Sequence, residues 1–553
     1  MKKRTVWLIV SGFMMLLLVL VSSGSAEEPK YGGTLRISWP NDPQDFDQAY
    51  KTAWLAYTLD LTNETPAGAD WAKGPAGTKE LTLQLHDWPP SKYLTGFALE
   101  SWEYPDPTTF ILHIRKGIHF HNKPPVNGRE LVADDFVVSL KRMFTMPGSW
   151  LVNVATKPIS YETPDKYTVV LKFDKLDASM EYRIFSTIYI VPREVVWDET
   201  GKETEALRNW KNACGTGPFM LVDYVKGSVL TFDKNPNYWQ RDPLRPKNKL
   251  PYLDRIQLMI IPELSTRIAA LRTGAIDYLI SVPWEQTKDL DKSNPKLRKA
   301  ASLQRGPNTL YMRNDIKPFS DIRVRQALSM AIDRKAMIND LYGGYAEYLM
   351  DRFHPHALGV FTPYDKLTGK AKEVLTYDPQ KAKQLLAEAG YPNGFNTEIL
   401  THKAFENEPV FVASYWDKIG VRAKIDMKEW TIFNSIGYGK KYAGLMMDAG
   451  SNAVAQQTPD NSATGHYSNF SVVTDPWWDE MRKKAMGTLD EAERLGMYRQ
   501  MNIYALEQSW TISLPTPHEF VYWQPWLKNF EGAQMMGTYH YWRPFTYVWL
   551  DKN

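Results

Sequence analysis

Two neighbouring segments differ in how their apolar residues are spaced. They are Thr109-Phe-Ile-Leu-His-Ile-Arg115 and, after a turn, Ala133-Asp-Asp-Phe-Val-Val-Ser-Leu-Lys-Arg-Met-Phe144. In the first segment alternate residues are apolar, which predicts a half-buried strand. In the second segment apolar residues recur at helical spacing behind an acidic pair, and carboxylates are favourable at the positive end of a helix dipole. A strand followed closely by a helix indicates a mixed α/β fold.

Further strands are expected along the chain. Residues 167–173 repeat the period of two, with Tyr167, Val169 and Leu171 on one face. Residues 255–261 are almost continuously apolar, which predicts a strand that is buried on both faces. No repeated unit and no low-complexity block interrupts the pattern, so solenoid and linker-array folds are excluded.

Capping residues predict the helices that lie between these strands. An apolar stripe that Ser320 can cap predicts one helix over residues 320–342. Asp378-Pro379 begins a second helix, which Gly390 ends, and Asp490 with Glu493 has the spacing of a capping box at the start of a third.

The amino terminus has the pattern of a secretory signal peptide. A basic start precedes an apolar run from Val6 to Val21, and the small residues Gly24 and Ala26 favour cleavage after Ala26. The run is shorter than the roughly 20 residues of a spanning helix. A soluble periplasmic protein is therefore predicted, with an uncleaved anchor as the alternative.

Charge and cysteine content narrow the function further. The 553 residues are enough for about three to four domain-sized units. Without the three leader cations the chain has 63 basic and 63 acidic residues, which gives no electrostatic reason to expect nucleic acid as a partner. Cys214 is the only cysteine, so no disulfide forms within the chain, and burial as a packing residue is expected of it.

Short motifs in a fixed order resemble those of the family 5 extracellular solute-binding proteins of ABC importers, the dipeptide- and oligopeptide-binding group. They cover nearly the whole mature chain. They are Tyr31-Gly-Gly-Thr-Leu-Arg36, Leu112-His-Ile-Arg-Lys-Gly-Ile-His-Phe-His121 with Ala133 to Arg142, Gly215-Thr-Gly-Pro-Phe219, Lys234-Asn-Pro-Asn-Tyr-Trp239, Arg272-Thr-Gly-Ala-Ile-Asp277, Ile322-Arg-Val-Arg-Gln-Ala-Leu328, and Ala382 to Pro392.

The resemblance implies an α/β fold with two lobes, of the periplasmic-binding-protein-like kind (type II, large cluster). An extra subdomain is expected within the first lobe. Two crossings that act as a hinge are expected near Ile261 to Glu263 and near Trp510 to Leu514. The expected units are a signal peptide over 1–26, lobe I over 27–55, 158–262 and 510–553, an inserted subdomain over 56–157, and lobe II over 263–509.

By position in the family pattern, the resemblance also places residues in the cleft between the lobes. The loop Trp39 to Asp47 is one of the segments expected there. Glycines in the cleft would let the backbone approach a ligand, and aromatic residues would offer flat apolar faces. An arginine could pair with a carboxylate of the ligand. For each residue an ordinary structural role is the alternative. The expected residues are Trp39, Gly215, Gly217, Arg305, Tyr311, Trp430, Asp448, Ser451, Asn452 and Tyr467.

One departure from the family bears on the ligand. Peptide-binding members typically have an Asp that anchors the ammonium group of the peptide, and here Ser451 or Asn452 falls at that position. Asp448 could replace it if the turn is reshaped. A short peptide therefore remains the first expectation, and an oligosaccharide or another polar solute is the alternative, which the 20 tryptophans mildly favour.

No catalytic motif is present, so we expect neither an enzyme nor a cofactor. The best metal suggestion is His113, His119 and His121, for which a structural role is the stronger expectation. We expect a monomer that binds a small solute or peptide and docks on membrane permease subunits. A secreted hydrolase and a sensory binding protein are the remote alternatives.

Overall fold

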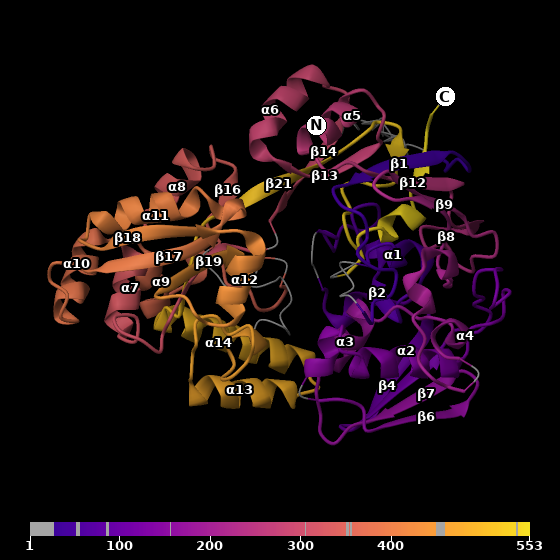
Figure 1. Cartoon of the computed structure of the whole chain (residues 1–553), viewed down its shortest axis with the longest axis horizontal. Helices are drawn as coiled ribbons and strands as arrows, with labels where there is room; N and C mark the ends of the chain where they lie inside the picture. Colours follow the sequence, from indigo (N-terminus) through magenta and orange to yellow (C-terminus); the bar gives the residue numbers. More distant parts are fainter. Residues whose placement is uncertain are drawn as a thin grey trace, which may run out of the picture.

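The computed structural model describes residues 27–50, 56–84, 88–154, 156–198, 200–304, 306–349, 353, 355, 357–449, 459–537 and 540–552. The expected signal peptide lies outside them. Within the described ranges no helix combines the length and the apolar character needed to cross a membrane. Figure 1 shows two α/β bodies side by side, which confirms the predicted class and the two-lobed fold.

Lobe I is built on a large mixed sheet with β1 near its centre. Leu35 and Ile37 of β1 are fully buried, and β1 pairs in parallel with β12. The strands in spatial order are β14 (Arg298–Leu303), β21 (Thr516–Trp523), β13 (Tyr278–Pro283), β1 (Thr34–Trp39), β12 (Arg255–Ile260), β9 (Val229–Lys234) and β8 (Phe219–Val225), with β16 (Ala346–Glu347) paired to β21.

Two helices and several short elements complete lobe I. The helices α5 and α6 pack against β13. The elements are α5 (Leu264–Arg272), α6 (Trp284–Ser293), α1 (Leu59–Thr62), β2 (Ala67–Ala69), β3 (Leu94–Gly96), β10 (Arg241–Asp242), β11 (Arg245–Lys249), β22 (Leu527–Lys528) and β23 (Trp549–Leu550).

The prediction that residues 255–261 are buried on both faces is wrong. Ile256, Leu258 and Ile260 are buried, whereas Gln257 and Met259 are half-buried. The reason is that the second face of β12 is only partly covered, with Met259 packed against the cluster that includes α5.

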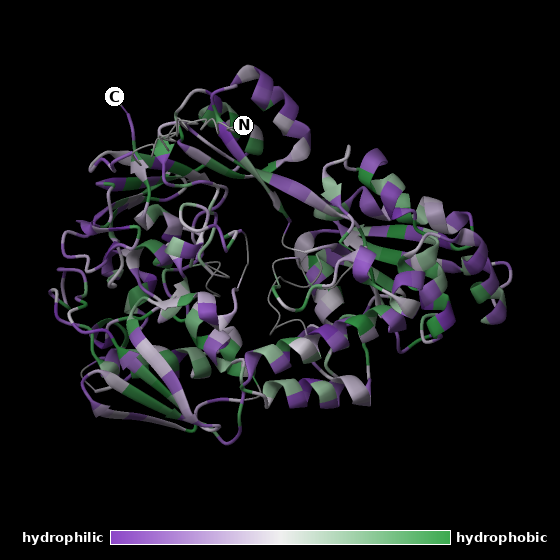
Figure 2. Ribbon diagram, turned by 180° about the vertical axis from the view of Figure 1, so that it is seen from behind, coloured by the Kyte–Doolittle hydropathy of each residue, from purple (hydrophilic) through white to green (hydrophobic). Residues whose placement is uncertain are grey.

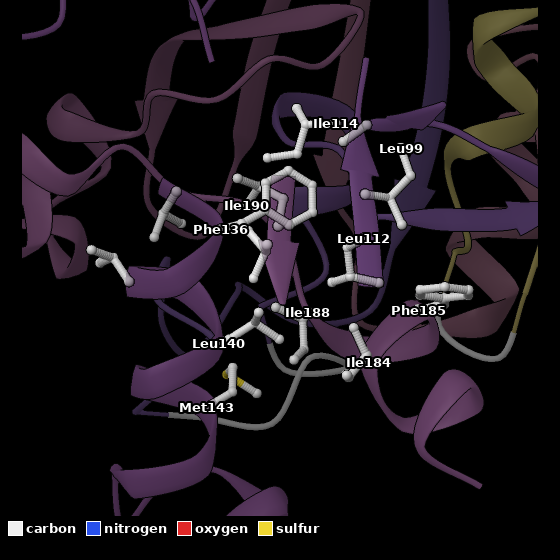
Figure 3. Close-up of a cluster of buried hydrophobic side chains, with 14 of the residues drawn as sticks. Leu99, Leu112, Ile114, Phe136, Leu140, Met143, Ile184, Phe185, Ile188 and Ile190 are labelled. Atoms are coloured by element: carbon white, nitrogen blue, oxygen red, sulfur yellow. The ribbon is translucent and has the colours of Figure 1, made fainter. Parts of the chain in front are cut away.

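A four-stranded antiparallel sheet forms the inserted subdomain. Its order is β4 (Leu99–Asp106), β5 (Thr109–Ile114), β7 (Thr168–Lys172) and β6 (Ser160–Asp165). It is covered by α2 (Ala133–Thr145), with α3 (Met180–Thr187) and α4 (Arg193–Val196) nearby. Figure 3 shows Leu112 of β5 and Leu140 of α2 in one buried cluster with Phe185 of α3, so the predicted strand and helix pack together.

The expected boundary between residues 157 and 158 falls inside this subdomain. Strands β6 and β7, which were expected in lobe I, complete the sheet of β4 and β5. The cause is the antiparallel pairing of β5 with β7, which joins Phe110 to Leu171 across the expected boundary.

Lobe II has a five-stranded sheet with helices on both sides, and Figure 2 shows hydrophobic stretches along its strands. The strand order is β18 (Arg422–Lys428), β17 (Asn396–His402), β19 (Leu445–Ala449), β15 (Asn308–Met312) and β20 (Thr511–Ser513). The helices are α7 (Ile322–Met330), α8 (Arg334–Asp340), α9 (Gly369–Leu375), α10 (Pro379–Glu388), α11 (Glu408–Asp417), α12 (Trp430–Tyr438), α13 (Pro476–Met486) and α14 (Glu491–Gln508).

Two of the predicted helix starts are confirmed, and the third is corrected. Asp378 accepts the backbone N–H of Lys381, and Asp490 accepts that of Glu493, each at 2.8 Å. The single helix expected over 320–342 is divided into α7, which Asp321 rather than Ser320 caps, and α8, which Asp333 caps.

In the part of the chain that the structure describes, the sheets of the two lobes are joined by the connection from β14 to β15 and by the connection from β20 to β21. The short strand β16 pairs with Thr516 and Pro517 at the start of β21, next to the second connection. The expected first crossing at Ile261 to Glu263 is therefore wrong, and residues 263–303 belong to lobe I. Their place is fixed by pairing, because β13 lies beside β1 and β14 lies beside β21.

Candidate functional site

A group of polar and aromatic side chains lies at the carboxyl edge of the lobe II sheet. Strands β17 and β19 run parallel, so their ends place His402 and Asp448 next to each other, with 3.6 Å between Nε2 and Oδ1. Helix α12 begins at the same edge and brings the Trp430 ring to 4.7 Å from the His402 ring. Ligands commonly bind at the carboxyl ends of parallel strands in α/β sheets.

His402 and Asp448 still have hydrogen-bonding capacity. The Nδ1 atom of His402 accepts the N–H of Ala404 at 3.4 Å, which places the proton of a neutral ring on Nε2. That Nε2 atom is buried and has no hydrogen-bond partner among the described residues. Among the described residues, Asp448 receives the N–H of Ala449 at 2.7 Å and lies beside this ring. The pair can therefore bind a polar group of a solute.

Exposed aromatic rings continue this surface. Trp430 is 53% exposed and Tyr467 is 52% exposed, although both rings contact other aromatic residues. Tyr467 stacks on Tyr438, which contacts Phe470, and Phe470 packs edge-on against Tyr311. In Figure 1, α12 lies on the side of lobe II that faces lobe I. Large exposed rings facing a second lobe are suited to contact a solute between the lobes.

The residues expected on the lobe I side have structural partners. Trp39 packs against Tyr57 and against Trp542, with ring centroids 5.3 and 5.0 Å away. Gly215 and Gly217 are buried against the chain itself, because a Cβ on Gly215 would lie 2.2 Å from the carbonyl oxygen of Thr62. The close approach that both glycines permit is therefore to the backbone at residues 62–63, and it needs no ligand.

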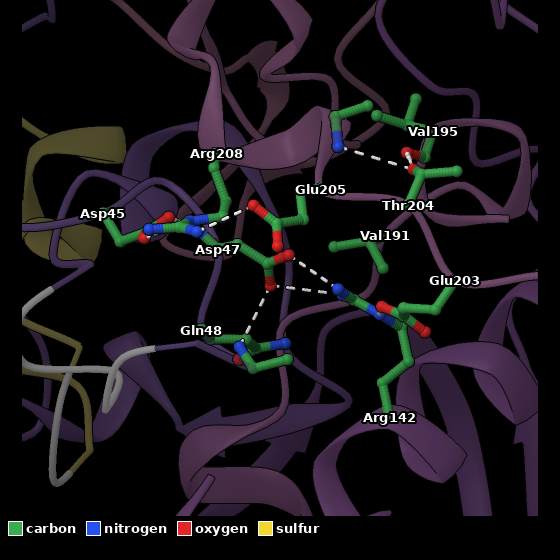
Figure 4. A network of polar contacts seen from close by, with 12 residues as sticks. Asp45, Asp47, Gln48, Arg142, Val191, Val195, Glu203, Thr204, Glu205 and Arg208 are labelled. Atoms are coloured by element: carbon green, nitrogen blue, oxygen red, sulfur yellow. Dashed lines mark hydrogen bonds and ion pairs between the residues drawn. The ribbon is translucent and has the colours of Figure 1, made fainter. Parts of the chain in front are cut away.

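The far end of the loop Trp39 to Asp47 is also tied to the protein rather than open to a solute. Asp47 pairs with Arg142 at 2.6 Å, and both side chains are buried. Asp45 pairs with Arg208 at 2.9 Å. Figure 4 shows these carboxylates pointing toward the two arginines, so this part of the loop anchors lobe I to the inserted subdomain.

Two concave sites lie where the lobes face each other. A pocket of about 210 Å³ beside the crossings is lined by Trp284 and Glu519 from lobe I and by Glu408 from lobe II. Glu408 accepts the Asn308 amide at 2.9 Å, and burial raises its pKa above the ordinary range. Burial likewise raises the pKa of Glu519. This hinge pocket is polar and spans both lobes.

The second pocket, of about 240 Å³, lies at the opposite end of the lobe interface, and Tyr467 lines it. There α3 of the subdomain meets α13 of lobe II, and the Ala178 N–H donates to the Met486 carbonyl at 2.8 Å. An ion pair of 3.0 Å between Arg183 and Asp460 crosses the same junction. The lobes therefore touch at two separate places.

The structure brings four of the expected site residues to one side of lobe II: Tyr311, Trp430, Asp448 and Tyr467. Arg305, Ser451 and Asn452 lie outside the described residues. His402, Arg183 and Arg482 were missed. The sequence carries no local signal for them, because Arg183 and its partner Asp460 are 277 residues apart.

The histidines that suggested a metal site have separate structural roles. His121 is buried, its Nε2 donates to the Gly217 carbonyl at 3.1 Å, and its Nδ1 accepts the Gly215 N–H at 3.3 Å. Within the described ranges no group of three or more His, Cys, Asp or Glu side chains could hold a metal ion. Cys214 is buried, and burial raises the pKa of its thiol to about 12, as expected of a packing residue.

Two lobes, two crossings and pockets between them define a solute-binding protein of the periplasmic type. The model of bacterial extracellular solute-binding proteins, family 5 Middle, matches residues 93–474. The chain belongs to this family of solute-binding proteins of ABC importers.

Curated relatives and a solved structure agree with this assignment. Heme-binding protein A of Haemophilus influenzae is 29% identical over 74% of this chain and 76% of its own length. Di/tripeptide-binding protein 1 of Pseudomonas aeruginosa is 28% identical over 79% of this chain and 83% of its own length. The fold is similar to the periplasmic binding protein DppA of Helicobacter pylori in complex with the peptide STSA, with a TM-score of 0.69, 23% identity and coverage of 95% and 99% of the two chains.

Proposed function

We propose that this chain captures a short peptide, or a polar solute of similar size, between its lobes in the periplasm and delivers it to an ABC permease. The observation that carries the proposal is that one side of lobe II has the exposed rings of Trp430 and Tyr467, the Asp448 carboxylate, and a His402 Nε2 that has no hydrogen-bond partner among the described residues. These groups offer apolar faces together with an acceptor and a donor, which is the combination that a peptide or sugar requires.

The proposed mechanism is closure of the lobes around the solute. A ligand shifts the balance between open and closed forms only by the contacts that it gains with the second lobe. The connections between β14 and β15 and between β20 and β21 are where backbone rotation would occur. Binding without chemical change is the whole activity in this proposal, and the relatives, which are named as binding proteins, support it.

The second candidate is a non-peptide solute. One relative is named for heme and another for glutathione, and exposed aromatic rings also suit sugars. Asp448 would favour a solute with an ammonium or several hydroxyl groups, because a carboxylate only accepts hydrogen bonds.

A panel of solutes tests the proposed function. Melting of the purified mature protein is followed with dipeptides, tripeptides, glutathione, heme and neutral and acidic oligosaccharides. A solute at 100 times its Kd should add about 2.7 kcal/mol to the free energy of unfolding. Absence of any shift across the panel would contradict the proposal, and a shift with sugars alone would favour the second candidate.

Replacing Trp430 with alanine should weaken binding of the solute by about 1 to 3 kcal/mol. The physical reason is the loss of a large exposed apolar face. The measurement is the Kd by calorimetry together with the melting temperature of the unliganded protein. Trp477→Ala is the matched control, since Trp477 also lies at the start of a lobe II helix, is 39% exposed and packs on an aromatic ring, that of Tyr504. Equal losses of affinity in both variants would speak against a role of Trp430 in binding.

A further inference from the structure

The pocket between α3 and α13 combines side chains from the inserted subdomain and from lobe II. Trp150 and Arg183 lie on the subdomain side, and Asp460, His466, Tyr467 and Arg482 lie on the lobe II side. Any group bound in this pocket would therefore contact both lobes, as closure of the lobes around a solute requires.

Hydrogen-bond donors are in excess in this pocket. Asp460 receives Arg183 Nη2 on Oδ2 at 3.0 Å and Arg482 Nη1 on Oδ1 at 2.8 Å, so one carboxylate serves two guanidinium groups. The Nε of Arg482 is buried and has no hydrogen-bond partner in the described part of the chain. The Nδ1 of His466 accepts the Ser468 N–H at 3.2 Å, which leaves a neutral ring with a donor at Nε2.

Charged groups around His466 agree with this excess of hydrogen-bond donors. Lys440, two residues after the end of α12, places its Nζ 3.0 Å from the carbonyl oxygen of His466. Burial lowers the pKa of His466, and Arg482, Arg183 and Lys440 lower it further against the opposing effect of Asp460. Two further acidic groups lie nearby: Asp177 Oδ2 is 3.9 Å from the Nε of Arg183, and Asp479 accepts the N–H of Thr464 at 3.0 Å.

We propose that this pocket binds a carboxylate group of the solute, held between Arg183 and Arg482, with Trp150 and Tyr467 against the adjoining apolar part. The inference rests on the proposed function and names the chemical class of its ligand. In the empty protein Asp460 occupies the two guanidinium groups. A solute carboxylate would add an acceptor for the Nε of Arg482, and it would join the two lobes at the end opposite the hinge.

The test compares solutes that differ only in a carboxylate. Tripeptides and their C-terminal amides, and uronic and neutral oligosaccharides, are titrated into the wild-type protein by calorimetry. The carboxylate form should bind about tenfold to 100-fold more tightly, as expected for a charge-assisted hydrogen bond. The preference should disappear in Arg482→Gln and persist in part in Arg482→Lys. The matched control Lys483→Gln removes a charge from the neighbouring, exposed position of α13 and should leave the preference unchanged.

The possible outcomes distinguish the carboxylate inference from the proposed function. If solutes bind and the two forms bind equally, this inference fails while the proposed function stands. If the preference for the carboxylate survives in Arg482→Gln, the carboxylate is held elsewhere and the inference is wrong. If no solute in the panel binds the wild-type protein, the proposed function fails and the inference with it. A purely structural role of Arg482 would change the melting temperature of the unliganded variant but not the ratio of the two affinities.

Discussion

Arg142→Met is expected to lower the free energy of unfolding by about 3 to 5 kcal/mol, because it leaves the Asp47 carboxylate buried without its counter-ion. The Arg142 side chain is 2% exposed and that of Asp47 is fully buried. Arg142 also pairs with Glu203, so one guanidinium holds two carboxylates from different parts of the chain (Figure 4). Chemical denaturation followed by circular dichroism measures the loss.

A matched control lies in the same network. Arg208→Met removes a guanidinium that is 44% exposed and pairs with Asp45 and Glu205. Asp45 is 3% exposed but also accepts the backbone N–H groups of Phe46 and Asp47, so a smaller loss than in Arg142→Met is expected. The double variant Asp47→Leu with Arg142→Met should recover most of the stability, since apolar residues of similar volume replace buried pairs well. Similar losses in Arg142→Met and Arg208→Met would show that burial of the pair carries no special cost.

The parts of the fold that could be predicted from the sequence rest on local interactions. The alternation in residues 109–115 and the stripe in 133–144 involve neighbours in the chain, and both gave the expected elements. The caps at Asp378 and Asp490 bind backbone groups three residues away. Such interactions leave a signature in a short window of sequence.

Where the structure differs from the sequence-based predictions, the cause is an interaction between segments that are far apart in the chain. The helix expected over 320–342 is interrupted where Arg334 is buried and donates to the Ser513 carbonyl, 179 residues away. The first crossing was placed too early because the pairing of β13 and β14 with β21 joins residues more than 200 positions apart. The apolar strand at 255–260 resembled the end of a lobe, although the lobe continues beyond it.

In the candidate site, too, some residues could be expected from the sequence and others depend on contacts between distant segments. Trp430 and Tyr467 were expected in the site from family position, and both are exposed in the structure. His402 and Asp448 come from two strands, and their approach follows from the parallel pairing of β17 with β19. The Gly215 and Gly217 turn looked like a ligand site because glycine permits close approach, whereas the group that approaches is the chain's own Thr62.

His121 should make the stability of the protein fall between about pH 6.5 and pH 4. Burial lowers the pKa of this imidazole from its ordinary value of 6.5 to about 4. In that window the unfolded chain binds a proton at His121 and the folded chain does not, so unfolding takes up a proton and acid favours it. Above pH 6.5 the ring is neutral in both states and this cost is absent.

The variant His121→Gln isolates this effect, because glutamine does not titrate and its amide can still donate to the Gly217 carbonyl. It should be less stable than the wild type at pH 7, but the difference in the free energy of unfolding should shrink by about 2 to 3 kcal/mol on going to pH 4.5. His119→Gln is the control, since His119 is exposed and lies two residues away on the same segment. A difference between His121→Gln and the wild type that stays constant from pH 7 to pH 4.5 would show that the buried ring is protonated as readily in the folded protein as in the unfolded chain.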